Sequence, residues 1–130
     1  QATYADWGAS KLKRLGLAND LVEPVPCWVR QRDRTYHSAV AVRKWFEGKG
    51  IAVRSIDLLS YGPHARRSRL LFERALGKNV RVGIVAADVQ DYDSQRWWRS
   101  SEGVRDVVGE AIAYLYARVT VCFLESEQEN

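Results

Sequence analysis

A strand–helix–strand pattern in residues 51–87 constrains the fold of this chain more than any other feature. The first apolar segment ends in the string SIDLLS, and the second is VRVGIVAA at residues 80–87. Between them, YGPHARRSRLLFERALG has a Gly-Pro start, apolar residues at helical spacing and a glycine stop. The pattern predicts two parallel strands, because a helical crossover returns the chain to the same end of the sheet.

The rest of the chain extends this alternation of helices and strands. Three further segments have apolar residues at helical spacing, namely residues 5–15, 35–46 and 104–119. Residues 21–25 are a short apolar run before a polar loop, and we interpret them as a strand, although Pro24 would sit awkwardly in a central one. The sequence thus predicts an α/β fold with three parallel strands, in which helices cover both faces of the strand at 80–87.

Local signals mark where the helices begin. Asp33 or Thr35 can cap the helix at 35–46, and Ser100 can cap the last helix, with Glu102 in its first turn. The first helix has no strand before it. We therefore expect residues 1–130 to form a single α/β domain from which a preceding strand is absent.

Composition narrows the class of ligand. The net charge is +4, and of twenty basic residues fifteen are Arg, whose guanidinium group binds phosphate and carboxylate in a fork. Acidic small molecules suit this bias, whereas a nucleic-acid partner is not expected, because the charges are interspersed with sixteen acids and form no Lys runs. Cys27 and Cys122 belong to no CxxC pair and are expected to be buried, reduced thiols. No apolar run approaches the ~18 residues of a membrane span.

The loops that follow the expected strands carry most of the polar chemistry. The carboxyl ends of parallel strands open on one edge of a sheet, where such folds bind ligands. Seven arginines are expected there: Arg30, Arg32, Arg34, Arg66, Arg67, Arg96 and Arg99. Each loop also leads into a helix whose first N–H groups are unpaired and attract anions. The sequence predicts an anion-binding crevice; the alternative is that these arginines pair with neighbouring acids in solvent.

His64 is the candidate catalytic residue. It follows Gly-Pro at a helix start, where its ring could face the crevice beside Arg66 and Arg67 and act as an acid or a base. The alternative is a histidine that only hydrogen-bonds a loop. Arg32, Arg34, Arg66, Arg67 and Arg99 are the candidate ligand-binding cations, and Thr35 and Tyr61 would orient the ligand.

Other features allow less specific interpretations. Asp88, Asp91 and Asp93 could bind a hard cation, but turn formation explains them as well, and we assign no metal. Trp97 and Trp98 could stack on a ring or cover the core. The sequence has no nucleophile elbow, phosphate loop or GxGxxG.

Three strings resemble the YdcF-like family, which includes the SanA and ElyC envelope proteins. They are DRTYHSAVAVRKWF, LLSYGPHARRSRLLFERALG and RWWRSSEGVRDVVGEAIAYLYAR, and the similarity runs from about Tyr4 to Arg118. His64 and Arg67 have the spacing of the family's His-x-x-Arg. The family commonly has Thr-x-Glu-Asn where this chain has Thr35, Tyr36, His37 and Ser38, so only the threonine matches.

The resemblance implies a three-layer, Rossmann-like parallel sheet with an additional N-terminal strand. It implies a phosphorylated or nucleotide-like ligand, with S-adenosylmethionine among the candidates, and a link to bacterial envelope or polysaccharide metabolism. Many members have an N-terminal membrane anchor, so either a cytoplasmic domain or one attached through an absent upstream anchor is expected.

Two functions of different classes remain open. The first is a small enzyme or binding domain that holds such a ligand beside His64. The second is a non-catalytic, envelope-associated interaction module, in which a basic surface meets acidic partners or lipid headgroups and His64 is structural. A deep pocket with both His64 and Arg67 would favour the first, and a flat face with those side chains in salt bridges the second. The sequence sets neither the reaction nor the oligomeric state.

Overall fold

The computed structural model of the chain describes residues 2–28 and 33–128, with side chains as far as residue 120. The chain divides into two compact units, Gln1–Val53 and Arg54–Asn130. No helix in the described ranges is long and apolar enough to cross a membrane.

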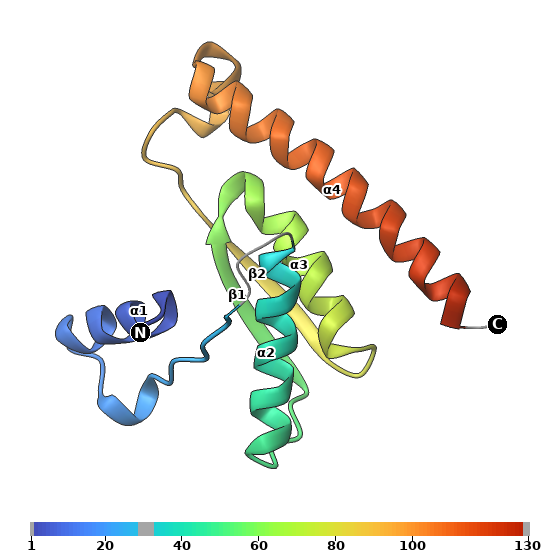
Figure 1. Ribbon diagram of the computed structural model, residues 1–130. Coiled ribbons are helices and arrows are strands. Elements are labelled where there is room, and N and C mark those ends of the chain that lie inside the picture. Colours follow the sequence, from blue (N-terminus) through green and yellow to red (C-terminus); the bar gives the residue numbers. More distant parts are fainter. Residues whose placement is uncertain (1, 29–32, 129–130) are drawn as a thin grey trace. The chain divides into compact units, whose positions relative to one another are not determined.

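The first unit is helical in its described residues (Figure 1). It contains α1 (Tyr4–Arg14), the short 3-10 helix η1 (Asn19–Leu21) and α2 (Arg34–Gly48). Both long helices were predicted. A capping box begins α1, because the Thr3 hydroxyl accepts a hydrogen bond from the Asp6 amide at 3.2 Å and the Thr3 amide donates to the Asp6 carboxylate at 2.8 Å.

The strand predicted at residues 21–25 is wrong. Leu21 ends η1, and residues 22–28 have no regular secondary structure. Pro24 and Pro26 have no N–H group, so neither can donate a backbone hydrogen bond to a neighbouring strand. The loop after residue 25 was expected to leave the carboxyl end of this strand, and that expectation is wrong as well.

The start of α2 also differs from expectation. Asp33 occupies the N-cap position, but its φ is 63° and its side chain makes no cap hydrogen bond. A capping side chain requires an extended backbone at that position, and the left-handed conformation of Asp33 does not provide it. Thr35 is already inside the helix. Arg30 and Arg32 lie outside the described residues.

The second unit contains the predicted strand–helix–strand pattern. Its elements are β1 (Ser55–Tyr61), α3 (Gly62–Leu76), β2 (Arg81–Ala87), η2 (Ser94–Arg99) and α4 (Ser101–Gln128). The two strands are parallel, with Ser55 opposite Arg81 and Tyr61 opposite Ala87. Pro63 lies in the first turn of α3 and Gly77, at φ 88°, ends it, as predicted. The fold is therefore α/β, but with two strands in the described residues rather than three.

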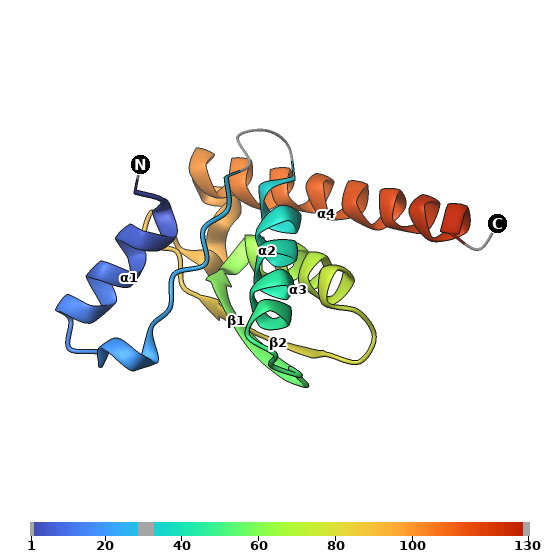
Figure 2. The same cartoon turned by 60° about the horizontal axis from the view of Figure 1, so that its bottom comes forward.

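The two faces of this sheet differ in their cover. α3 packs against β1 and β2 (Figure 2). The Ser60 and Ser68 hydroxyls lie 3.4 Å apart between β1 and α3. Val82 is buried at 2% exposure, whereas on the opposite face Leu59 is 75% and Val85 56% exposed. The cover on both faces expected for β2 is thus incomplete at Val85.

α4 begins as predicted, but it presents an unexpected side to α3. The Ser100 hydroxyl accepts a hydrogen bond from the Gly103 amide at 2.9 Å, and Glu102 lies in the first turn. In the predicted apolar series, all residues except Val107 are exposed: Val104, Val108, Ala111, Leu115 and Val119. The less exposed residues follow another helical line, made by Gly103, Val107, Glu110, Tyr114 and Ala117. Helical periodicity was sufficient to locate the helix but not to orient it.

The two cysteines have different outcomes. Cys27 is free and half-buried, which is a milder burial than predicted. The side chain of Cys122 lies outside the described part of the chain.

Candidate functional site

The first turn of α3 places His64 at the carboxyl end of β1. Tyr61 ends the strand and Gly62 begins the helix without an intervening loop, so Pro63 and His64 stand at the sheet edge. Tyr61 occupies the N-cap position and makes no side-chain cap hydrogen bond. The side chain at the N-cap position therefore accepts no hydrogen bond from the first N–H groups of α3.

Glu110 of α4 contacts both His64 and Arg67 of α3. Its Oε1 lies 3.0 Å from Nδ1 of His64, and its Oε2 accepts a hydrogen bond from Nε of Arg67 at 2.8 Å. Nη2 of Arg67 donates to Oε1 at 3.0 Å, which completes a two-point contact between guanidinium and carboxylate. The side chain of Arg67 is 22% exposed and that of Glu110 24% exposed, so this cluster is half-buried.

The charge state of Glu110 follows from these contacts. Burial alone would raise the pKa of its carboxyl, but the hydrogen bonds from Arg67 and His64 and the positive charge of Arg67 outweigh it and lower the pKa. Glu110 is therefore ionised at neutral pH, and it cancels the charge of Arg67.

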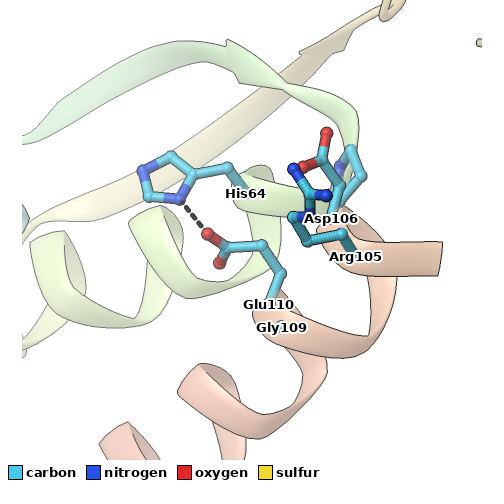
Figure 3. Close-up of a pocket in the computed structure, with 6 residues that line it drawn as sticks. His64, Arg105, Asp106, Gly109 and Glu110 are labelled. Atoms are coloured by element: carbon cyan, nitrogen blue, oxygen red, sulfur yellow. Dashed lines mark hydrogen bonds and ion pairs between the residues drawn. The ribbon is translucent and has the colours of Figure 1, made fainter. Parts of the chain in front are cut away.

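The contacts of Nδ1 allow His64 two neutral forms. Nη2 of Arg67 lies 2.9 Å from Nδ1, and a guanidinium can only donate. When Nδ1 carries the proton it donates to Glu110, and Nε2 has a free lone pair. When Nδ1 accepts from Arg67, Nε2 carries the proton. The cluster can therefore present either a base or an acid at Nε2, which points away from Glu110 in Figure 3.

A pocket of about 260 Å³ lies beside this cluster, and we call it the carboxyl-edge pocket. Its lining residues come from the start of α3 and the first turns of α4: Pro63, His64, Arg105, Asp106, Gly109 and Glu110 (Figure 3). A Cβ atom built on Gly109 would meet nothing within 4 Å, so the missing side chain leaves open space there. The lining contains one arginine, Arg105, and two carboxylates, Asp106 and Glu110. Arg67, which lies beside the lining, balances the charge of Glu110.

The loop after β2 adds a tyrosine near this pocket. Burial, followed by the negative charges of Asp106 and Asp91, raises the pKa of Tyr92. The Tyr92 hydroxyl oxygen is buried close to Asp106, although no described residue makes a hydrogen bond of good geometry to it. Asp93 accepts a hydrogen bond from the Gln95 amide at 2.9 Å, which is a turn role. Within the described ranges, no three His, Cys, Asp or Glu side chains gather to hold a metal ion.

The structure brings together only part of the predicted site. His64 and Arg67 meet at Glu110, while the guanidinium of Arg66 lies over the Tyr114 ring, 5.7 Å from its centroid. Tyr61 is 67% exposed and does not line the pocket, and Arg99 is exposed at the end of η2. Arg34 and Thr35 belong to the first unit, and Arg32 lies outside the described residues. Trp97 and Trp98 pack edge to face with centroids 6.0 Å apart, and Trp98 is 60% exposed.

Three polar residues of α4 were missed by the sequence analysis. Arg105, Asp106 and Glu110 line the pocket, but the sequence analysis singled out none of them. A signal was present for Glu110. It lies at helical spacing with Gly103, Val107 and Ala117, so a choice of that line as the packed face would have pointed Glu110 toward α3.

Comparisons of this chain with protein-family models, with curated proteins and with solved structures find no match.

Proposed function

We propose that this chain is a YdcF-like α/β domain that binds a phosphorylated or nucleotide-like ligand in the carboxyl-edge pocket. The observation that carries the proposal is the contact of one carboxylate, Glu110, with both His64 and Arg67 at the edge of that pocket. A half-buried histidine oriented by a carboxylate is an arrangement suited to proton transfer. The proposal includes the family's link to bacterial envelope or polysaccharide metabolism.

In this proposal His64 acts on the ligand through Nε2. Glu110 and Arg67 are positioning residues, because both contact the imidazole at Nδ1 and leave Nε2 for the ligand. The first N–H groups of α3, which the side chain at the N-cap does not bind, and the guanidinium of Arg105 bind the phosphate. Gly109 leaves room for the remainder of the ligand.

The proposal extends to a three-layer, Rossmann-like arrangement in which helices cover both faces of the sheet. The apolar side chains on the face away from α3 support it, since Leu59 is 75% and Val85 56% exposed beside covered neighbours. Strands that present apolar side chains on both faces are typical of sheets packed between two helical layers.

Ligand binding is tested by filling the pocket. In a thermal-shift screen against adenosine monophosphate, S-adenosylmethionine and glucose 1-phosphate, at least one probe should raise the midpoint of the unmodified chain. Gly109→Leu should abolish that shift, whereas Gly8→Leu, at an open glycine of α1, should leave it unchanged. Equal shifts in both variants would contradict the proposal.

The role of His64 requires a second pair of variants. His64→Gln retains a polar side chain but cannot transfer a proton at neutral pH, so it should preserve binding of the probe and remove any turnover of it. His37→Gln, at the exposed histidine of α2, is the matched control and should change neither. Turnover that survives in His64→Gln would reduce the domain to a binding function.

One observation favours the interaction module as a second candidate. The side chains of His64 and Arg67 are both engaged by Glu110, as a purely structural ion pair would be, and the pocket lining does not include Arg67. If no probe shifts the midpoint, while Glu110→Gln destabilises the fold, the cluster is structural and the module is the better assignment.

A further inference from the structure

A second hollow lies at the opposite edge of the two-stranded sheet, and we call it the amino-edge hollow. It has a volume of about 550 Å³ and is lined by Arg54, Ser55, Lys78, Asn79, Val80 and Arg81. These residues are the start of β1, the turn after α3 and the start of β2. The Arg81 amide donates to the Arg54 carbonyl at 2.9 Å, so the backbones of the two arginines lie side by side, and both residues line the hollow.

The charges of this hollow are all of one sign. Three of its lining residues are cations and none is an acid. In the described part of the chain, Arg54, Lys78 and Arg81 take part in no ion pair. The Ser55 hydroxyl and the Asn79 amide add neutral hydrogen-bonding groups. Like charges held together repel one another, and a bound anion would relieve that repulsion.

Helix electrostatics accounts for only one of the three cations. Lys78 directly follows Gly77, the C-cap of α3, where a positive charge offsets the negative end of the helix dipole. Arg54 and Arg81 stand at the starts of strands, and strands carry little net dipole. The two arginines therefore need another explanation.

We propose that the amino-edge hollow binds a phosphate-bearing anion, independently of the carboxyl-edge pocket. Arg54 and Arg81 supply guanidinium forks, Lys78 a compact charge, and Ser55 and Asn79 further donors. The open form of the hollow admits either a free phosphorylated molecule or the headgroup of a lipid, and both sources present the same chemistry.

Calorimetric titration with inorganic pyrophosphate tests the site, and sedimentation with vesicles separates the two sources. Vesicles of phosphatidylcholine alone are compared with vesicles that also contain phosphatidylglycerol. The triple variant Arg54→Gln, Lys78→Gln, Arg81→Gln should bind pyrophosphate at least about tenfold more weakly than the unmodified chain. A control triple of equal charge change, Lys13→Gln, Arg14→Gln, Lys44→Gln, should stay within about twofold.

The outcomes separate cleanly. If the first triple variant loses pyrophosphate binding and the control triple keeps it, the result supports a site for free phosphate. If the first triple variant loses only the binding of vesicles, the same site is assigned to a lipid headgroup. Equal weakening in both triples, or no binding of either probe to the unmodified chain, overturns the proposal. Pyrophosphate binding that is lost in Gly109→Leu, which fills the other pocket, but kept in the first triple would place the site in that pocket and also overturn the proposal. Arg81→Gln alone provides the same comparison if the triple does not fold.

Discussion

The two hollows at opposite edges of the sheet have contrasting electrostatics. In the carboxyl-edge pocket the positive charge of Arg67 is held by Glu110 through two hydrogen bonds, of 2.8 and 3.0 Å, and Arg105 stands beside Asp106. In the amino-edge hollow Arg54, Lys78 and Arg81 face no carboxylate among the lining residues. Beside one hollow the charge of Arg67 is paired with Glu110, whereas the three cations of the other are left for solvent or a ligand.

This difference separates two uses of a cation. A guanidinium paired with a half-buried carboxylate fixes geometry, and here it fixes the imidazole of His64. A cluster of unpaired cations instead raises the local concentration of anions and is screened by salt. The carboxyl-edge pocket is accordingly suited to orienting a reacting group, and the amino-edge hollow to holding charge.

The comparison is tested most strongly at Glu110. Glu110→Gln leaves Arg67 half-buried without its counter-charge, and we expect the free energy of unfolding at pH 7 to fall by about 2 kcal/mol. Glu73→Gln breaks the exposed Arg69–Glu73 pair of α3, at 2.9 Å, and should cost only about 0.3–0.5 kcal/mol. Urea unfolding measures both. Equal losses would mean that the Glu110 cluster is no more than a surface ion pair.

Acidification should remove the contribution of the Glu110 carboxylate to the free energy of unfolding. Its pKa is lower in the folded chain than its ordinary value of 4.5, so the unfolded chain binds the proton first as the pH falls. The stabilisation is complete above that ordinary value and is lost as the pH falls through the lower, folded-state pKa. The unfolding curves of the unmodified chain and Glu110→Gln should therefore converge in acid. A constant difference down to the acid limit would show that protonation of Glu110 is not involved.

The sequence was sufficient for the elements of the second unit because their signals are local. Apolar runs, the Gly-Pro start at Pro63 and the stop at Gly77 specify β1, α3 and β2 without reference to the rest of the chain. Ser100 caps α4 for the same reason. The strand at residues 21–25 failed because a strand needs a partner, and a run that contains Pro24 and is followed by Pro26 can donate fewer hydrogen bonds to one.

The site was less accessible to sequence reasoning because its central contact is long-range. His64 and Glu110 are 46 residues apart, and the helical spacing of Glu110 with Val107 and Ala117 indicates only that it faces α3, not which residue it meets. The spacing of His64 and Arg67 was the useful local signal, since one helical turn places both side chains on one face. Arg66, the next residue along, lies over Tyr114 instead.

Gly109 tests whether the carboxyl-edge pocket lowers the free energy of unfolding, an effect that is not expected of the amino-edge hollow. A glycine inside a helix destabilises it relative to alanine, and a Cβ atom at Gly109 meets no neighbour within 4 Å. Gly109→Ala should therefore raise the free energy of unfolding by about 0.5–1 kcal/mol. Gly103→Ala in the same helix should lower it, because the added Cβ would overlap the Trp97 carbonyl oxygen. Urea midpoints that move in the same direction for both variants would contradict this account of the pocket.

The smallest effect is expected at the amino-edge hollow. Arg81→Gln removes one of three like charges that make no ion pair in the described residues, so the free energy of unfolding should change by less than about 0.5 kcal/mol. The change should favour the variant at low salt, where repulsion among the cations is least screened, and vanish at about 1 M salt, where the Debye length falls to about 3 Å. Unfolding in urea at both salt concentrations measures it. A loss as large as that of Glu110→Gln would mean that Arg81 has a structural partner, and the contrast between the two hollows would no longer hold, because both sets of cations would then serve the fold.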